Sequence, residues 1–337
     1  MIKRLFTLAV LLTSMLAASA AVRGDVTGDG VVDIDDLNAV INVMVHKNSD
    51  AGIEARADID GNGMVDIDDL NTVINVMVGK DSGGTAETRT YTINGVSFKM
   101  ISVEGGTFTM GATAEQGRDA DSDEYPAHQV TLSSYAIGET EVTQALWQAV
   151  TGSNPSWFSV GNNYGTNLQR PVECVSWDDC QEFITKLNQL TGQNFRMPTE
   201  AEWEHAARGG NKSKGYKYAG SNTLGDVAWY WGSIPSQSSG TSGYGTQTVA
   251  TKSPNELGLY DMSGNVFEWC QDWYSDVYYS SSPSTNPTGP TSGSFRVLRG
   301  GGWGNDARHC RVLNRDSNSL SRRNSSIGLR LALGALE

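Results

Sequence analysis

Two clusters of aspartates near the start of the chain carry oxygen ligands at the spacing of a calcium-binding loop. Residues 25–36 (DVTGDGVVDIDD) and residues 58–69 (DIDGNGMVDIDD) repeat one pattern with a period of 33. Oxygen-bearing side chains fall at loop positions 1, 3, 5, 9 and 12, with glycine for the sharp turn at position 6 and a backbone carbonyl at position 7. Oxygen ligands suit a hard cation, so each loop predicts one Ca²⁺ site. The expected ligands are Asp25, Thr27, Asp29, Val31, Asp33, Asp36, Asp58, Asp60, Asn62, Met64, Asp66 and Asp69.

Each loop leads directly into one amphipathic helix. Apolar residues recur at i, i+3, i+4, i+7 and i+8 from Leu37 and again from Leu70, and no comparable helix is predicted before either loop. A duplicated loop and helix resembles the type I dockerin module, over residues 24–80. The resemblance implies docking onto a cohesin through loop positions 10 and 11, which are Ile34-Asp35 and Ile67-Asp68 here. The alternative is a stand-alone, calcium-stabilised stalk.

The first twenty residues have the character of a secretory signal. Lys3 and Arg4 precede a largely apolar run, and residues 18–20 (ASA) offer a cleavage site. We therefore expect a secreted protein, extracellular or periplasmic, and no transmembrane segment, because the apolar run is too short to span a bilayer comfortably. The expected organisation is a signal peptide at 1–20, the calcium module at 21–80, a small polar linker at 81–90 and a large domain at 91–337.

Overall charge narrows the class of partner. The formal net charge is −13 over 337 residues, which argues against nucleic-acid or anionic-membrane binding, since both need a basic surface. Hydrophobic residues make up 38% of the chain, which indicates a folded protein, and its 38 glycines favour many turns over long helices.

The large domain is predicted to contain short strands and few helices. A strand-turn-strand pattern begins at Tyr91, and further strands are expected at 106–110, 129–132 and 134–137. Helices are expected at 143–150, 177–190 and 199–208, the last with a capping box formed by Thr199 and Glu202. These elements leave long irregular stretches, which predict loops fixed by ions or hydrogen-bond networks.

Several segments of this domain resemble the formylglycine-generating enzyme, or sulfatase-modifying factor, family. They are residues 105–111 (GGTFTMG), 137–143 (IGETEVT), 195–210 (FRMPTEAEWEHAARGG), 258–269 (GLYDMSGNVFEW), 296–303 (RVLRGGGW) and 327–330 (IGLR). The resemblance covers residues 91–334 in the family's order. It implies an α+β domain of C-type-lectin-like fold with little regular secondary structure, beside the small α-helical calcium module.

The resemblance also implies one calcium ion in the large domain. In the family a segment matching residues 263–268 holds the ion through backbone carbonyls and a carboxylate, so the expected ligands are Ser263, Gly264, Val266 and Glu268. A charge between Phe267 and Trp269 would be costly without a partner, which makes a cation reasonable. The alternative partner for Glu268 is an arginine.

Catalysis is not expected, because the family's copper site is incomplete. The resemblance implies two cysteine thiolates five residues apart as Cu(I) ligands, and this sequence has Cys310 at the second position but Asn305 at the first. An amide does not replace a thiolate for Cu(I), so we expect no copper. The competing hypothesis is an active oxidase that modifies sulfatase cysteines.

The segment 303–324 is dense in small polar side chains, as ligand-binding loops are. It resembles the variable region of ligand-binding proteins diversified by retroelements, and the alternative is an ordinary polar loop. We expect a concave binding face here for a protein or glycan ligand. Trp157 and Trp229 are possible aromatic platforms, although burial is the ordinary fate of tryptophan. The expected contacts are Trp303, Asn305, Asp306, Arg308, His309, Arg311, Arg315 and Arg322.

Overall fold

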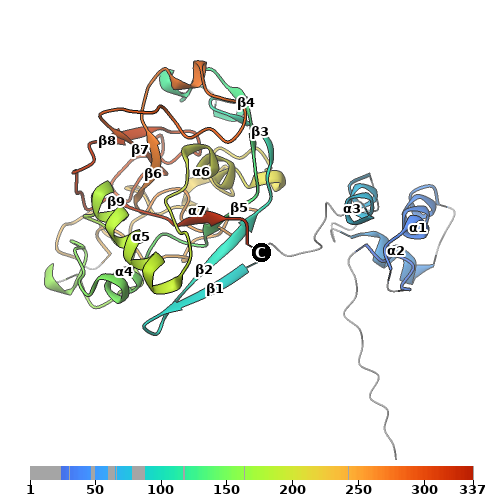
Figure 1. Ribbon diagram of the computed structural model, residues 1–337, viewed down its shortest axis with the longest axis horizontal. Coiled ribbons are helices and arrows are strands. Elements are labelled where there is room, and N and C mark those ends of the chain that lie inside the picture. Colours follow the sequence, from blue (N-terminus) through green and yellow to red (C-terminus); the bar gives the residue numbers. More distant parts are fainter. Residues whose placement is uncertain are drawn as a thin grey trace, which may run out of the picture. The chain divides into compact units, whose positions relative to one another are not determined.

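The computed structural model describes residues 24–29, 31–46, 50–59, 65, 67–77, 88–116, 118–162, 164–241 and 243–336. The chain divides into two compact units, Met1–Thr85 and Ala86–Glu337 (Figure 1). Among the described residues, no helix has the length and apolar character needed to cross a membrane.

The described part of the small unit contains three helices: α1 (Ile34–Met44), α2 (Ala51–Ala57) and α3 (Ile67–Met77). Helix α1 begins with a capping box between Asp33 and Asp36. The buried apolar side chains of this unit include Val26, Val40 and Val73, so both repeats contribute to one core. The expectation that no helix precedes either loop is wrong for the second loop. Helix α2 precedes it, because the Asp50 side chain accepts hydrogen bonds from the amides of residues 52 and 53 and caps the helix.

The described residues of the large unit contain three sheets (Figure 1). The first has the order β1-β2-β5-β10, from β1 (Thr88–Ile93), β2 (Val96–Val103), β5 (Tyr135–Gly138) and β10 (Ala332–Gly334). The second pairs β3 (Gly106–Met110) with β4 (His128–Leu132). The third has the order β8-β7-β6-β9, from β8 (Asp316–Asn318), β7 (Arg296–Arg299), β6 (Phe267–Trp273) and β9 (Ile327–Gly328).

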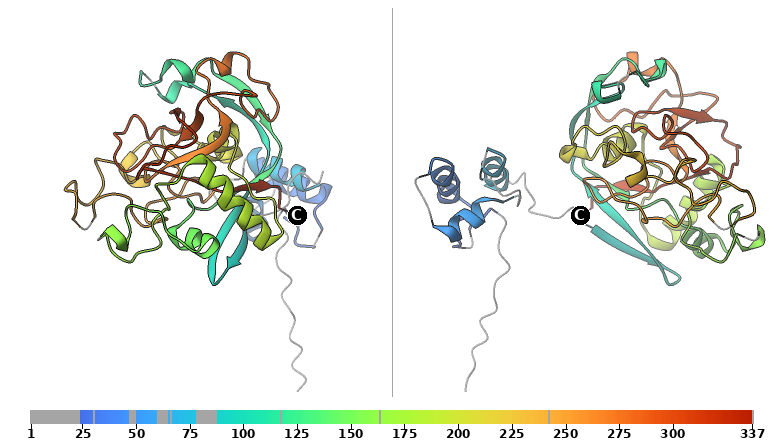
Figure 2. Two further views of the ribbon diagram at one scale, coloured as in Figure 1. Left: turned by 60° about the vertical axis from the view of Figure 1, so that its left-hand side comes forward. Right: turned by 180° about the vertical axis from the view of Figure 1, so that it is seen from behind.

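Helices and loops lie beside and between these sheets (Figure 2). The helices are α4 (Gln144–Thr151), α5 (Trp177–Thr191), α6 (Glu200–Ala207) and the short α7 (Leu224–Val227). Single 3₁₀ turns lie at Ala114–Gln116, Ser122–Glu124, Val160–Asn162, Gly210–Lys212 and Tyr278–Ser280. The helices predicted at 143–150, 177–190 and 199–208 are confirmed to within about a residue, and so is the capping box of Thr199 and Glu202.

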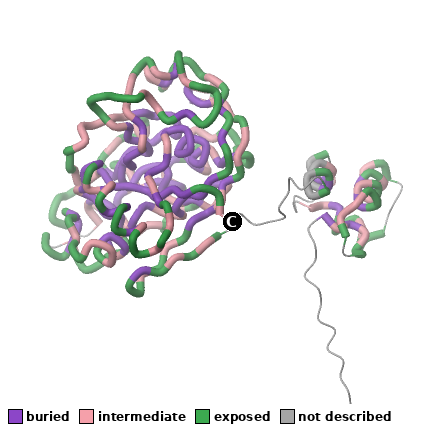
Figure 3. Tube along the Cα trace, viewed as in Figure 1, coloured by how far each residue is buried: buried purple, intermediate pink, exposed green. Residues whose placement is uncertain are grey.

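The core of the large unit lies on both sides of strand β6. Alternate side chains of a strand point to opposite faces, so Trp269 packs with α5 and the first sheet, whereas Cys270 packs with α6 and the second sheet. Figure 3 shows the buried residues gathered in the middle of this unit, with exposed residues along its loops. A two-sided core of this kind fixes the loops that carry the candidate site.

Candidate functional site

The segment 303–324 alternates between displayed and buried stretches. Residues 304, 306 and 308 are exposed, residues 311–315 are buried, and residues 321–323 are exposed again. Tight turns support the first stretch: the His309 amide donates to the Asp306 carbonyl at 3.3 Å, and the Cys310 amide donates to the Ala307 carbonyl at 3.3 Å. The segment is therefore buried in its middle and has exposed residues on both sides.

Two arginines make the anchor. The guanidinium of Arg311 donates to both carboxylate oxygens of Glu124, at 2.7 and 2.9 Å. The guanidinium of Arg315 donates to both oxygens of Glu200, at 2.7 and 2.9 Å. Both arginine side chains are 0% exposed. Paired hydrogen bonds between guanidinium and carboxylate fix orientation as well as position, so the backbone from 311 to 315 is held in one register.

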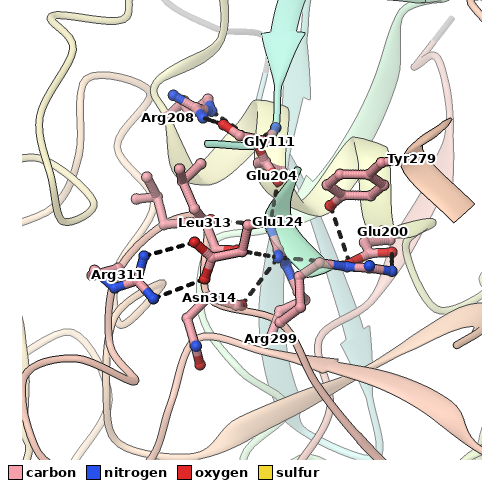
Figure 4. Close-up of polar contacts among 12 residues, drawn as sticks. Gly111, Glu124, Glu200, Glu204, Arg208, Tyr279, Arg299, Arg311, Leu313 and Asn314 are labelled. Atoms are coloured by element: carbon pink, nitrogen blue, oxygen red, sulfur yellow. Dashed lines mark hydrogen bonds and ion pairs between the residues drawn. The ribbon is translucent and has the colours of Figure 1, made fainter. Parts of the chain in front are cut away.

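The side chain of a third arginine, Arg299 of β7, binds the backbone of residues 312–314 (Figure 4). It donates to the carbonyls of Val312, Leu313 and Asn314 at 2.8 to 3.0 Å and forms an ion pair of 2.6 Å with Glu204. Glu200 lies 3.6 Å from the same guanidinium. Although burial opposes its ionisation, Arg315 and Arg299 lower the pKa of Glu200. The buried charges therefore compensate one another within one network.

This network corrects part of the expected contact set. Arg311 and Arg315 are buried and ion-paired inside the unit, so they position the segment and do not face a ligand. Trp303 is 8% exposed, and its indole donates to the Ser325 carbonyl at 2.9 Å. We expected Trp303, Arg311 and Arg315 to contact a ligand. The neighbouring sequence does not reveal that each of these side chains is bonded to a distant residue of the same unit.

The remaining expected contacts lie at or near the surface. Arg308 and Arg322 are exposed, and Arg308 forms an ion pair with Asp121. His309 Nδ1 lies 2.9 Å from an Asp306 carboxylate oxygen, and this hydrogen bond lowers the pKa of Asp306. The Asn305 side-chain oxygen accepts from the Gly302 amide at 3.2 Å. The structure thus brings Asn305, Asp306, Arg308 and His309 together in one displayed turn.

Tryptophans on neighbouring loops extend this face. Trp157 is 51% exposed, while Trp229 is partly buried, with its indole donating to Thr251 and the ammonium of Lys252 4.2 Å from the ring centroid. Trp231, which was not among the expected contacts, is 41% exposed, and its amide donates to the Asn305 carbonyl at 3.0 Å. Residues 229–231 (WYW) could have signalled a displayed aromatic, but nothing local says which ring is outside.

The position where the resemblance implies the family's copper site holds one buried thiol. Burial raises the pKa of Cys310 to about 12, and its sulfur contacts the Asp306 carbonyl at 3.6 Å. Asn305 supplies an amide where the resemblance implies a second thiolate. This donor set does not fit Cu(I), which soft thiolates select.

The predicted calcium segment of the large unit contains a carboxylate that already has a cationic partner. The Glu268 carboxylate accepts from the Arg330 guanidinium at 2.8 to 3.0 Å and from the Trp203 indole at 2.7 Å, which is the arginine-paired alternative. Ser263 donates its hydroxyl hydrogen to the Cys310 carbonyl at 2.8 Å. Gly264 and Val266 engage through their amides, with the Gly300 carbonyl at 2.8 Å and the Glu141 carboxylate at 3.1 Å.

Two further buried carboxylates beside this segment were missed by the sequence analysis. Burial raises the pKa of Asp261 to about 6 and, with Asp261 and Glu268 as neighbours, raises the pKa of Glu141 well above its usual range. One oxygen of Asp261, Oδ1, is buried without a hydrogen-bond partner. The carboxyl groups of Glu141, Asp261 and Glu268 lie around one guanidinium, that of Arg330. An added cation would therefore balance negative charge here, and Oδ1 of Asp261 is the oxygen available to bind it. Within the described ranges, however, no three His, Cys, Asp or Glu side chains converge as a ready metal cluster.

In the small unit, the carboxylates of the first acidic loop accept hydrogen bonds from backbone amides of the same loop. Asp25 accepts from the amides of residues 28 and 29 at 2.6 and 3.1 Å, and Asp36 accepts from those of residues 26, 27 and 33 at 2.8 to 2.9 Å. Asp29 and Asp33 accept from the amides of Val31 and Asp35, and the Thr27 hydroxyl lies 3.4 Å from Asp25.

The second loop repeats the buried bond of the first. The Asp69 carboxylate accepts from the Ile59 amide at 2.7 Å, as Asp36 does from the Val26 amide at 2.9 Å. The residue preceding Ile59, Asp58, is also described. The other predicted ligands of this loop, Asp60, Asn62, Met64 and Asp66, lie outside the described residues.

The chain resembles several known proteins in sequence and in fold. The chain is 34% identical over 250 residues to the chaperone protein LppX of Paenibacillus barcinonensis, covering 62% of this chain and 79% of that protein. It is 32% identical over 284 residues to the formylglycine-generating enzyme of Streptomyces coelicolor, covering 69% and 88%. The solved structure of Treponema denticola variable protein 1 is 37% identical, with a TM-score of 0.61, covering 73% of this chain and 99% of that one.

A family match places these similarities on one domain. Residues 90–335 match the sulfatase-modifying factor enzyme 1-like domain. The family resemblance found in residues 91–334 of the sequence is therefore confirmed, and the chain belongs to the sulfatase-modifying factor enzyme 1-like family.

Proposed function

We propose that the large domain binds a ligand. In this proposal it keeps the fold of the family but does not carry out the copper-dependent oxidation that the resemblance implies for the family's enzymes. One observation carries the proposal: Arg311 and Arg315 fasten the middle of the segment 303–324 to Glu124 and Glu200, while the polar side chains on either side remain displayed. A segment anchored through side chains that face inward can vary its outward side chains without losing its fold.

The similarity to a protein named variable protein 1 supports this function. In our proposal the outward positions, among them Asn305, Asp306, Arg308 and His309, form the recognition surface, and diversification would act on them. An ordinary polar loop is the alternative. Sequencing the segment in independent isolates would separate the two: substitutions concentrated at outward positions, with Arg311 and Arg315 unchanged, support diversification, and an even spread contradicts it.

The binding test uses the displayed turn itself. Immobilised full-length chain should capture a component of the native culture, and the triple variant Asp306→Ala/Arg308→Ala/His309→Ala should lose that component. Lys99→Ala is the matched control, because Lys99 forms a surface ion pair of 3.0 Å with Glu139 and belongs to another part of the unit. Equal capture by wild type and triple variant would remove this turn as the recognition surface.

An active oxidase is the second candidate, favoured by the identity to formylglycine-generating enzymes. The amide at Asn305 and the buried thiol at Cys310 are the observations against it. Anaerobic Cu(I) titration against a chromogenic competitor distinguishes the candidates, with Cys310→Ala as the control. A stoichiometric site that disappears in Cys310→Ala would overturn the binding function, and equal weak uptake by both proteins supports it.

We propose that the amino-terminal unit is a dockerin-like, calcium-binding module of an exported protein. Its support is the 33-residue repeat and two matching exposed apolar pairs, Ile34 with Ile41 and Ile67 with Ile74, whose exposed fractions are 54, 38, 56 and 38%. Matching pairs suit a partner that binds either half, such as a cohesin, and a calcium-stabilised stalk is the alternative. Loss of cohesin binding only when both Ile34→Asp and Ile67→Asp are present would support docking, and unchanged binding in that double variant would contradict it.

A further inference from the structure

Two segments near the displayed turn, called the two loops here although the first includes helix α4, have an unusual composition for this acidic chain. Residues 142–169 and 227–251 contain no Asp, Glu, Lys, Arg or His, although charged residues make up 19% of the whole sequence. The same loops carry exposed tryptophans, Trp157 at 51% and Trp231 at 41%. Tryptophan is enriched at binding surfaces, so two exposed indoles on uncharged loops indicate a recognition surface.

The two loops are packed against each other by a cluster of aromatic rings. Phe158 lies 4.9 Å from Tyr164 and 5.2 Å from Trp303, and Tyr244 lies 4.9 Å from Trp303, measured between ring centroids. The interplanar angles of these pairs are 78, 90 and 68°, the edge-to-face geometry that aromatic rings favour. The cluster therefore joins both loops to the start of the segment 303–324.

Hydrogen bonds hold the backbone of both loops around this cluster. The Glu173 carboxylate accepts from the amides of Trp157 and Phe158 at 3.1 and 2.8 Å. The Tyr164 hydroxyl accepts from the Gly240 amide at 3.2 Å, and hydrogen bonding by Ser239, then by Gly240 and Trp157, lowers its pKa. The backbone that carries Trp157 and the link between the two loops are thus in place before a ligand binds, which reduces the entropy lost on binding.

We propose that Trp157 and Trp231 form a platform for a neutral carbohydrate chain. The faces of sugar rings expose C–H groups that stack on indoles, and their hydroxyls pair with amide and hydroxyl side chains. Both kinds of group are present here, the second as Asn162, Ser236, Gln237 and Thr241. The proposal deepens the proposed function by naming a ligand class, but it rests on the two loops and does not require the turn 305–309 to bind anything.

The charge pattern favours this ligand over the other classes. A basic or acidic partner would be matched by ionised side chains of opposite sign, and both loops contain none. A bilayer would need a continuous apolar surface, whereas serine, threonine, asparagine and glycine separate the tryptophans. The two loops instead combine aromatic rings with neutral polar side chains, and this combination suits an uncharged polyhydroxylated chain.

Affinity electrophoresis of the full chain tests the proposal. Native gels would contain a β-glucan, a mannan or an arabinoxylan, with polygalacturonate as the acidic control. We expect retardation by at least one neutral polysaccharide and none by polygalacturonate. Trp157→Ala/Trp231→Ala should weaken the retardation at least tenfold, with each single variant in between. The control is Phe295→Ala, because Phe295 is another exposed aromatic, at 48%, outside these loops.

The outcomes separate this site from the displayed turn. Retardation of Asp306→Ala/Arg308→Ala/His309→Ala to the wild-type extent is expected, so failure of one proposal leaves the other standing. Urea midpoints confirm that the variants are folded. No retardation of the wild type, retention of it by the double tryptophan variant, or an equal loss in Phe295→Ala would each overturn the proposal. So would a captured protein that depends on both tryptophans without any polysaccharide binding.

Discussion

Arg315 and Glu200 are joined by two hydrogen bonds of 2.7 and 2.9 Å although 115 residues separate them in the sequence. Glu200 is the first residue of helix α6, and Arg315 directly precedes strand β8. One ion pair therefore connects the family's central motif to the displayed segment, and the stability of the scaffold and the placement of the candidate site depend on the same contact.

Breaking this pair should be costly. Arg315→Ala leaves the Glu200 carboxylate buried with one partner fewer, and we expect the free energy of unfolding to fall by roughly 3–5 kcal/mol. Urea unfolding measures the change. Arg308→Ala is the control, because its pair with Asp121 is 55 and 35% exposed, so the loss should stay within about 1 kcal/mol. Equal losses would show that the buried network does not hold the segment.

Glu173 should make stability depend on pH. Burial raises the pKa of Glu173 to about 7, above its ordinary 4.5. Between these values the folded state keeps a proton that the unfolded state has released, so the unfolding free energy falls as pH rises, by up to about 1.4 kcal/mol per pH unit. Glu173→Gln should remove this contribution. Urea unfolding at pH 4.5, 6 and 7.5 gives the slope of the unfolding free energy against pH for each variant. Glu182→Gln is the control, because Glu182 is exposed. Equal slopes for wild type and Glu173→Gln would refute the prediction.

Calcium removal should loosen the amino-terminal unit. Without a cation the carboxylates of each loop repel one another, and a ligand at a hundredfold its Kd adds about 2.7 kcal/mol to stability. Calorimetry with chelator and with excess Ca²⁺ should therefore show a shift in one transition. Asp36→Ala and Asp69→Ala should each reduce the calcium-dependent shift, whereas Asp35→Ala, at a loop position without a predicted ligand, should keep it. Identical scans with chelator and with Ca²⁺ would contradict the calcium sites.

Gly245 should be required beneath the aromatic cluster. Its φ is +93°, and a Cβ there would lie 2.2 Å from a Phe158 ring carbon. Gly245→Ala should cost roughly 1–3 kcal/mol more than Gly240→Ala, which has φ +81° and open space around it, so that only backbone strain is shared. Urea unfolding of both variants measures the difference. Equal costs would mean that the cluster yields without penalty.

Much of the fold could be predicted because its signals are local. Asn94 and Gly95 both adopt positive φ in the turn between β1 and β2, as that dipeptide favours, and Thr199 caps α6 with Glu202 as its spacing indicates. The family motifs likewise identified the large domain. Helix α2 was missed because its seven residues are too few to show a period.

The site itself was only partly predictable. Composition and spacing alone show that residues 303–324 are polar and that two aspartate loops repeat, and the family resemblance implies that Asn305 replaces the thiolate partner of Cys310. The burial of Arg311 and Arg315 and the exposure of Trp157 and Trp231 follow only from the packing of the folded unit. The direction of a side chain in an irregular segment is set by partners such as Glu124 and Glu200, more than a hundred residues away, and no local period records them.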